Sequence, residues 1–118
     1  MAHGVWTDIV EIDPVVHDFA TKYFGLPTTH TRVIEDAVPF AQRMVSAGRK
    51  WDYIVHDVFT GGAEPVELFT LEFLQDLRSI LNPGGVIAIV SHHIALSFLT
   101  NHPSLSTLTG PPILFHYI

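Results

Sequence analysis

The chain has 118 residues, and 47% of them are hydrophobic, which is enough for one small apolar core. Its formal net charge is −6 with only six Lys and Arg, so nucleic acid and anionic membrane surfaces are not expected as partners. There is no cysteine, which excludes disulfides and thiolate metal sites. No secretory signal or spanning apolar run is visible, and a cytoplasmic location is the default expectation.

A strand and an amphipathic helix are predicted at the start of the chain. Residues 5–12 are rich in β-branched side chains and predict a buried strand. Asp13 and Pro14 are typical of a helix start, as N-cap and first-turn proline, and Gly25 is typical of its end. Apolar side chains recur between them at helical spacing and form one face of the helix: Val15, Val16, Phe19, Ala20 and Tyr23.

The same alternation continues along the chain. A short strand is predicted over residues 31–34 and a helix over residues 37–47, with Gly48 as its stop signal. The next strand is predicted over residues 51–56, and a loop with Gly and Pro follows over residues 57–65.

A third helix and a fourth strand complete the pattern. Thr70 is the expected N-cap of the helix, whose apolar face is Phe73, Leu74, Leu77, Ile80 and Leu81. Residues 82–85 (Asn-Pro-Gly-Gly) predict a turn into residues 86–90, which are almost wholly apolar, as in strands buried on both faces. Alternating strands and helices predict an α/β fold, a Rossmann-like parallel sheet with flanking helices.

The last part of the chain differs in composition. All charged residues lie between Asp8 and Arg78, and residues 91–118 contain none. The change predicts a boundary near residues 89–91. We therefore divide the chain into a partial Rossmann-like domain, residues 1–90, and an uncharged tail, residues 91–118, which is expected to be irregular.

Carboxylates follow three successive predicted strands, at the edge where parallel sheets bind ligands. Glu11 is suited to accept the hydroxyls of a ribose, and Asp36 is suited to accept an adenine amine beside the flat wall of Ala37. Asp57 is suited to act as a general base or to orient an amine. Structural alternatives are helix capping by Asp13 and Asp36, and simple solvation of Asp57.

In combination, five stretches resemble the spermidine/spermine-synthase-like group of class I S-adenosylmethionine-dependent transferases, of the methyltransferase kind. These are residues 10–14, 35–40, 51–57, 64–73 and 82–89. The resemblance implies S-adenosylmethionine, or its decarboxylated form, as cofactor. It implies that Glu11 holds the ribose, with Ile12 beside it in the cofactor site. It also implies that Asp36 and Ala37 contact the adenine, and that Asp57 is the catalytic residue beside the reacting sulfonium.

Two departures from the family pattern bear on the reaction. Glu35 stands where the family has the glycine of a Gly-Asp-Ala motif. Val58 and Phe59 follow Asp57 where the polyamine synthases have a further Asp-Pro pair. The second departure favours a methyltransferase-type relative over a true polyamine synthase.

The family's glycine-rich cofactor loop, with the strand before it, has no counterpart here, since only residues 1–4 precede the first predicted strand. In the family's strand order that strand lies between the strands ending at Glu11 and at Asp57. Both strands are therefore expected to lack a ladder partner, which is costly for buried amides. The expectation is an incomplete sheet that binds its cofactor weakly.

Three other interpretations stay open. A receiver-type signalling domain could use Asp57 as phosphoacceptor, but it also needs a Lys-Pro after a late strand. A nicotinamide-dinucleotide domain could use Glu11 for its ribose, but it leaves Asp36 unexplained. A truncated gene product without activity would keep the family assignment. The methyl acceptor, a small molecule or a protein, and the oligomeric state are not specified by the sequence.

The eight histidines do not form a metal-binding pattern. His92 and His93 are adjacent, so in a strand they would point to opposite sides and could not easily share one ion. No His-x-His or His-x3-His spacing occurs, and no metal site is predicted.

Overall fold

The computed structural model describes residues 6–26, 30–58, 65–91, 94–100 and 113–117, with side chains described up to residue 90. Three segments singled out in the sequence, residues 1–4, 59–64 and 92–93, lie outside the described part. The elements are β1 (Thr7–Glu11), α1 (Pro14–Phe24), β2 (His30–Ile34), α2 (Ala37–Ala47), β3 (Trp51–Asp57), the 3-10 helix η1 (Val66–Phe69), α3 (Leu71–Ser79), β4 (Leu81–Ser91), β5 (Ile94–Thr100) and β6 (Ile113–Tyr117).

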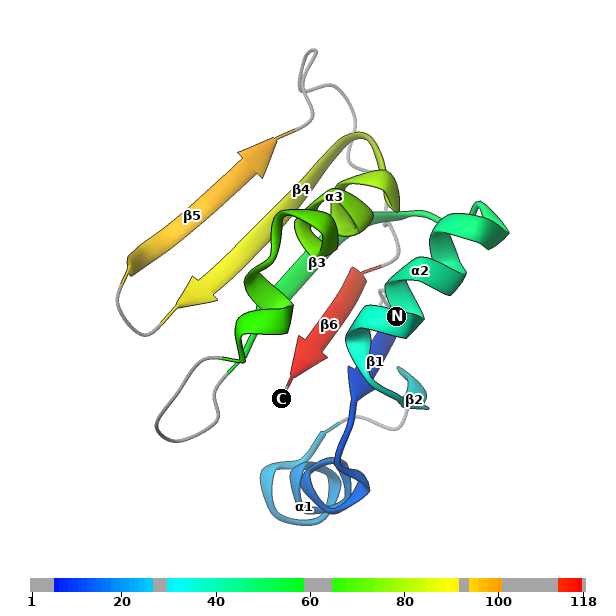
Figure 1. The fold of residues 1–118 in the computed structure, drawn as a ribbon. Coiled ribbons are helices and arrows are strands. Elements are labelled where there is room, and N and C mark those ends of the chain that lie inside the picture. Colours follow the sequence, from blue (N-terminus) through cyan, green and yellow to red (C-terminus); the bar gives the residue numbers. More distant parts are fainter. Residues whose placement is uncertain (1–5, 27–29, 59–64, 92–93, 101–112, 118) are drawn as a thin grey trace, which may run out of the picture.

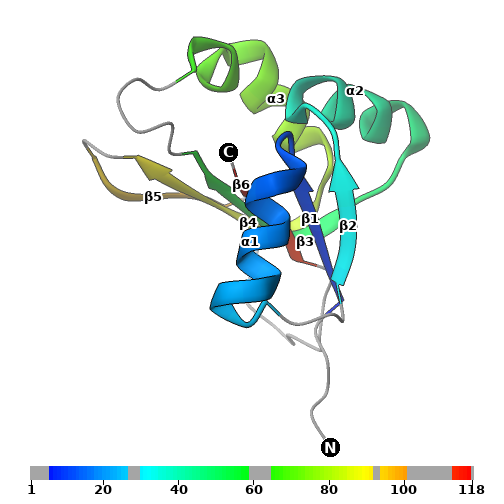
Figure 2. The same ribbon diagram turned by 90° about the horizontal axis from the view of Figure 1, so that it is seen from below.

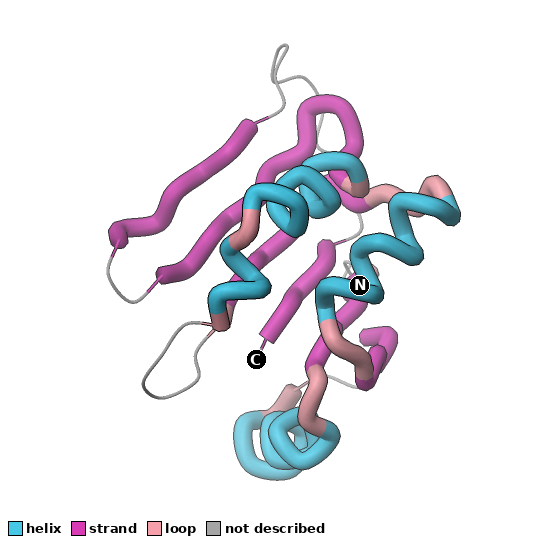
Figure 3. Tube along the Cα trace, in the orientation of Figure 1, coloured by secondary structure: helices cyan, strands magenta, loops and turns pink. Residues whose placement is uncertain are grey.

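The strands form one sheet in the order β2-β1-β6-β3-β4-β5 (Figure 1). All neighbouring pairs are parallel except β4 and β5, which are antiparallel. Helices separate the successive parallel strands β1, β2, β3 and β4 along the chain (Figure 3). The predicted α/β fold with a parallel sheet and flanking helices is confirmed.

The centre of the sheet corrects two expectations. β1 and β3 do not lack a partner, because β6 lies between them and pairs in parallel with both. The second correction concerns the tail, which the sequence predicted to be irregular. Its described residues beyond Ser91 form the strands β5 and β6. The physical reason is that the buried backbone groups of β1 and β3 need hydrogen-bond partners, and residues 113–117 supply them on both sides.

The sheet separates two layers of helices. α2 and α3 cover one face, and α1 lies on the other (Figure 2). The main core lies between the sheet and the pair α2 and α3, where Trp51 and Phe73 are almost completely buried. Other buried members of this core are Val10, Phe40, Ala41, Met44, Ile54, Leu77, Ile80 and Ile87. Among the described residues, no helix is long and apolar enough to cross a membrane.

The helices begin where the sequence predicts. Asp13 caps α1 and Asp36 caps α2, since each side chain accepts the backbone N–H two residues later, at 2.8 and 2.9 Å. Thr70 caps α3 by accepting the N–H three residues later at 3.2 Å. α1 and α2 end at the predicted residues Gly25 and Gly48. Local capping chemistry therefore sets these boundaries.

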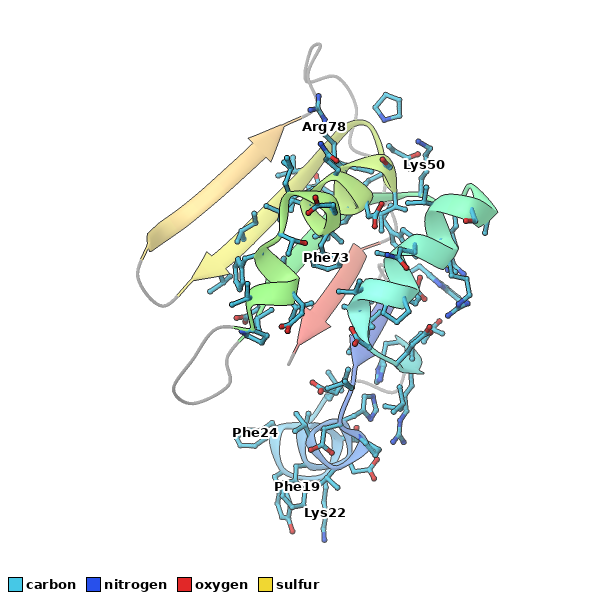
Figure 4. All side chains as sticks on the ribbon, in the orientation of Figure 1. Phe19, Lys22, Phe24, Lys50, Phe73 and Arg78 are labelled. Atoms are coloured by element: carbon cyan, nitrogen blue, oxygen red, sulfur yellow. The ribbon has the colours of Figure 1, made fainter. Side chains whose placement is uncertain are left out.

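The apolar face of α1 is not buried, contrary to the usual outcome for an amphipathic helix. Phe19 and Phe24 are 54% and 86% exposed and project from the helix, whereas Phe73 lies between α3 and the sheet (Figure 4). The buried residue of α1 is instead His17, whose Nε2 lies 2.7 Å from Nε2 of His30. Among the described elements α1 packs against β1 and has no second helix beside it, so most of its apolar stripe meets solvent.

The predicted turn at residues 82–85 is built into β4. β3 and β4 are in register at Trp51 and Leu81 and again from Tyr53 and Val86 onward, so five residues of β4 match two of β3. Gly84 has φ of 79°, a left-handed conformation that glycine adopts without strain. β4 therefore begins at Leu81, five residues before the strand that the sequence predicts over residues 86–90.

Candidate functional site

The carboxyl ends of β1, β2 and β3 lie at the same edge of the sheet, because these strands run parallel (Figure 1). Glu11 and Asp57 are both in register with Tyr117 of the strand between them. Neighbouring strands are about 4.8 Å apart, so their Cα atoms lie about 10 Å from each other. Asp36 follows β2, whose last residue Ile34 is in register with Glu11. The structure therefore brings all three predicted acids to one edge.

Glu11 is buried, with 2% of its surface exposed. Its Oε1 accepts the backbone N–H of Asp13 at 2.9 Å, and its backbone oxygen accepts the N–H of Glu35 at 3.2 Å. Its Oε2 is buried and has no hydrogen-bond partner among the described residues. Burial raises the pKa of the Glu11 carboxyl above 4.5, against the opposing effect of the Asp13 hydrogen bond. A buried carboxylate oxygen with an unused lone pair can accept a ligand hydroxyl.

The residues predicted beside the adenine lie at the start of α2. Asp36 is exposed, and its Oδ1 caps α2 as described above, so the capping alternative is confirmed for this oxygen. Ala37 is 4% exposed and belongs to the core with α2, so only a small part of it can form a wall of a site. Ile12, predicted in the cofactor site, is 48% exposed. A helix cap and a ligand contact are compatible, because a carboxylate has a second oxygen.

Glu35, which stands where the family has a glycine, makes contacts that a glycine could not make. Its carboxylate forms an ion pair with Arg43 on the exposed side of α2. This ion pair holds the Glu35 side chain against α2. The backbone N–H of Glu35 donates to the backbone oxygen of Glu11. The position that is glycine in the family is filled here by a residue held by α2.

Asp57 closes β3 and is partly buried, two residues before the segment 59–64 that lies outside the described residues. Sequence reasoning missed its neighbour His56, which is completely buried. His56 Nε2 lies 2.9 Å from the carbonyl oxygen of Leu68, which can only accept, so Nε2 carries the hydrogen. The ring also packs against Phe69 and Phe73, at centroid distances of 5.1 and 5.5 Å. His56 thus connects β3 to η1, the element that follows the loop after Asp57 in the sequence. A lone histidine in an apolar strand was the signal for it.

Across the described ranges, no group of three or more histidines and carboxylates is arranged to hold a metal ion. Asp8 is the other buried acid of β1, but it lies at the opposite end of the sheet. Its Oδ2 accepts from Trp51 Nε1 at 2.9 Å and from Arg49 at 2.7 Å. Asp8 therefore belongs to the framework and not to the carboxyl edge.

The sequence is similar to those of known proteins. The spermine/spermidine synthase domain matches residues 5–105. An N-terminal histidine N-methyltransferase of Emericella nidulans is 60% identical over 91 residues, which are 75% of this chain and 16% of that protein. A polyamine aminopropyltransferase of Vibrio vulnificus is 40% identical over 99 residues, which are 82% of this chain and 32% of that protein.

A third relative is more distant. A probable polyamine aminopropyl transferase of Bifidobacterium longum is 30% identical over 80 residues, which are 68% of this chain and 17% of that protein. The chain thus spans between about a sixth and about a third of the length of these relatives. None of these similarities favours the receiver or the nicotinamide-dinucleotide interpretation.

Proposed function

Because the chain belongs to the spermine/spermidine synthase domain family, we propose that the carboxyl edge of β1, β2 and β3 binds S-adenosylmethionine or its decarboxylated form. Members of the family use a cofactor of that class. In this proposal Glu11 and Ile12 lie at the ribose, and Asp36 and Ala37 lie at the adenine. Asp57 lies beside the sulfonium.

The observation that carries the proposal is the unpartnered Oε2 of Glu11. A ribose offers two neighbouring hydroxyls, and a carboxylate that has one free oxygen and one partly used oxygen can accept both. Burial raises the pKa of the Glu11 carboxyl, because it disfavours the ionised form. Hydroxyl donors favour the ionised form, and we expect affinity to rise with pH through the pKa of Glu11.

Asp36 supports the same ligand from the neighbouring strand. Its Oδ1 is occupied by the N-terminus of α2, which orients the carboxylate. Its second oxygen is then available for the amine of an adenine, since an ionised carboxylate is an acceptor on both oxygens. Ala37 adds a small buried side chain that leaves room for a flat ring beside α2.

Asp57 is the residue that would act in the transfer itself. A sulfonium carries a carbon that an amine can attack, with the carbon–sulfur bond electrons leaving on sulfur. The attacking amine then has one proton too many. Asp57 can accept this proton, or hold the amine in line for attack, from the end of the rigid strand β3. His56, the preceding residue of β3, is held by its hydrogen bond to the carbonyl oxygen of Leu68 in η1.

We propose methyl transfer over aminopropyl transfer. The support is that Val58 and Phe59 stand where polyamine synthases carry an Asp-Pro pair that would help to bind a polyamine. In agreement, the relative with 60% identity is an N-terminal histidine N-methyltransferase. An α-amino group, as on an N-terminal histidine, is an acceptor of the class that Asp57 could deprotonate.

The binding proposal is tested by calorimetric titration of the chain with S-adenosylmethionine and with decarboxylated S-adenosylmethionine. Glu11→Gln is expected to weaken binding at least about tenfold, because charge-assisted hydrogen bonds to the ribose are lost. Glu72→Gln, the same change on the exposed first turn of α3, is the matched control and should bind as the wild type. Equal affinity of the two variants would contradict the proposed role of Glu11.

The reaction is tested separately with a peptide that has an N-terminal histidine and with a polyamine as acceptors. Asp57→Asn is expected to lower the transfer rate by about 100-fold or more, a larger effect than the loss of cofactor affinity that removal of a carboxylate beside the sulfonium brings. Transfer of an aminopropyl group to the polyamine, with no methylation of the peptide, would show that the proposed reaction class is wrong while the cofactor site stands.

A further inference from the structure

One face of α1 is apolar and exposed, and the proposed cofactor site makes no use of it. Val15, Phe19 and Tyr23 follow one another at intervals of four residues and form a ridge along the helix, with Val16 beside it. These four residues, here called the α1 stripe, are between 47% and 62% exposed. Among the described elements α1 lies alone on its face of the sheet (Figure 2). The α1 stripe is therefore accessible to a partner.

The α1 stripe is an ordered surface of appreciable size. The rings of Phe19 and Tyr23 contact each other edge to face, with centroids 5.5 Å apart, so the two largest side chains are arranged before any partner binds. Phe19 projects away from the rest of the molecule (Figure 4). With roughly half of each residue exposed, the α1 stripe offers about 400 Å² of apolar surface, a size at which patches are often functional.

The charged residues of α1 lie along one edge of the α1 stripe. They are Asp18 and Lys22, one helical turn apart, and α1 contains no other Asp, Glu, Lys or Arg. The helix is thus neutral overall, although the whole chain has a net charge of −6. Asp18 lies 3.0 Å from Arg32 of β2 but is still 62% exposed, so it can accept from a further cation. A partner that fits this face has an apolar stripe edged by a base and an acid in the opposite order.

A second copy of α1, running in the antiparallel direction, has these properties. The middle of the α1 stripe and the midpoint between Asp18 and Lys22 both lie close to residues 19 and 20. A twofold axis at this point lays the α1 stripe on its own copy and brings Asp18 of one protomer beside Lys22 of its partner. A parallel arrangement would instead place like charges beside each other. The order of charges on α1 therefore favours an antiparallel pair.

We propose that the α1 stripe is a docking surface for a second copy of this chain, with the two α1 helices packed antiparallel about a twofold axis. The two stripes bury about 800 Å², and the charged edges bring the total to about 1,000 Å², the lower limit for a specific interface. The dimer is accordingly weak and forms as the concentration of the chain is raised. The proposal concerns α1 alone and does not depend on the proposed cofactor.

The dimer is tested by sedimentation velocity of the full chain. The wild type is expected to change from monomer toward dimer between about 5 and about 500 µM, the range in which a small interface associates. Phe19→Ser should raise the dissociation constant at least about tenfold, because Phe19 lies at the centre of the contact. A wild type that stays monomeric over the whole range would overturn the proposal.

Phe24→Ser is the matched control for Phe19→Ser. Phe24 is more exposed than Phe19, at 86%, but it lies outside the α1 stripe. The two residues are about 140° apart around the helix and point to different sides of it (Figure 4). Phe24→Ser should therefore dimerise as the wild type does. Equal effects of the two changes would overturn the assignment of the contact to the α1 stripe.

The orientation is tested with single cysteines, for which the cysteine-free chain gives no background. About the proposed axis, Val16 of one protomer faces Tyr23 of its partner. On mild oxidation Val16→Cys mixed with Tyr23→Cys should cross-link at least about tenfold faster than either variant alone. In either variant alone the two thiols are about 10 Å apart along the helices, whereas a disulfide needs Cα atoms about 4.4–6.8 Å apart. Faster cross-linking of Val16→Cys with itself would overturn the antiparallel packing.

The role of the charged edge is tested by reversing one charge. Lys22→Glu places Glu beside Asp18 on both sides of the axis and should raise the dissociation constant about tenfold at low salt. Lys22→Arg keeps the charge and should dimerise as the wild type does. In about 1 M salt Lys22→Glu should recover most of its dimerisation, because exposed charges are screened, whereas a local loss of helix would not recover. Wild-type dimerisation of Lys22→Glu at low salt, or no recovery in high salt, would overturn the proposed charge pairing.

Discussion

Asp8 and Trp51 form a buried hydrogen bond between two strands that are not neighbours in the sheet, with 2.9 Å between Asp8 Oδ2 and Trp51 Nε1. Both residues are almost completely buried, and Phe40 of α2 packs on the Trp51 ring at a centroid distance of 6.1 Å. The indole thus links β1, β3 and α2 at the amino end of the sheet. A buried carboxylate makes this link sensitive to the loss of a donor, since its other oxygen, Oδ1, has no described partner.

Trp51→Phe should therefore lower the free energy of unfolding by about 1–3 kcal/mol, because the ring packing is largely kept while the N–H donor to buried Asp8 is lost. Urea denaturation followed by circular dichroism measures this. The matched control is Trp6→Phe, the same change at a residue that is 64% exposed, which should alter stability by less than about 0.5 kcal/mol. Equal effects at Trp6 and Trp51 would contradict the structural role of the bond.

The buried carboxyl of Glu11 predicts a pH dependence of stability. Burial raises its pKa in the folded state above 4.5, so between 4.5 and the folded value the native protein binds more protons than the unfolded chain. Its contribution to stability is present below this window and is lost as pH rises through it. Glu11→Gln should consequently gain stability relative to the wild type as pH is raised from 4 to 7. Urea titrations at several pH values give the difference, and a difference that does not change with pH would contradict the prediction.

His17 predicts the opposite slope. Burial, Arg32 and the neighbouring His30 lower its pKa below 6.5, against a weaker opposing effect of Asp18. The unfolded chain then binds more protons than the native state just below pH 6.5, so this contribution is present above 6.5 and is lost as pH falls. The contact at 2.7 Å between the two Nε2 atoms also requires that one of them lacks a proton.

The variant His17→Gln should show a weaker loss of unfolding free energy between pH 7.5 and pH 5.5 than the wild type. Thermal or urea unfolding at the two pH values measures the two slopes. Identical slopes would show that the His17 ring does not control acid sensitivity. The His17 contact joins α1 to β2, so the loss should appear first in the exchange protection of α1.

Asp36 has a capping role that can be separated from its proposed ligand role. Asp36→Ala should cost about 1 kcal/mol of stability through the lost cap of α2, whereas Asp36→Ser keeps a capping oxygen and should cost much less. Both changes should weaken S-adenosylmethionine binding, since neither side chain offers a second carboxylate oxygen. Normal affinity in Asp36→Ser would restrict Asp36 to capping.

Burial predicts a sharp contrast between two phenylalanines. Phe24→Ser should change the free energy of unfolding by no more than about 0.5 kcal/mol, because Phe24 is 86% exposed at the end of α1. Phe73→Ala should cost about 3–5 kcal/mol, because Phe73 is 1% exposed in the core between α3 and the sheet. Similar losses at both positions would mean that α1 is covered in solution.

Much of the local structure was predictable from the sequence because its causes are local. Asp13, Asp36 and Thr70 are capping residues at helix starts, and apolar periodicity separates strands from helices over most of residues 6–91. The edge that gathers Glu11 and Asp57 was predictable because parallel strands have their carboxyl ends at the same side. The burial of His56 and its hydrogen bond to Leu68 depend on η1, a short helix that the apolar periodicity of the sequence does not predict.

By itself the sequence determined the α/β class, the family and the order of the elements up to β4, since propensity, capping and periodicity act between residues close in the chain. Only the tertiary structure decided that residues 113–117 lie between β1 and β3, that Oε2 of Glu11 is left without a described partner, and that the apolar side of α1 meets solvent. Each of these depends on which distant segments pair and pack. Backbone pairing is nearly blind to side-chain identity, so a charge-free segment 56 residues beyond the end of β3 carries no local sign that it will fill the centre of the sheet.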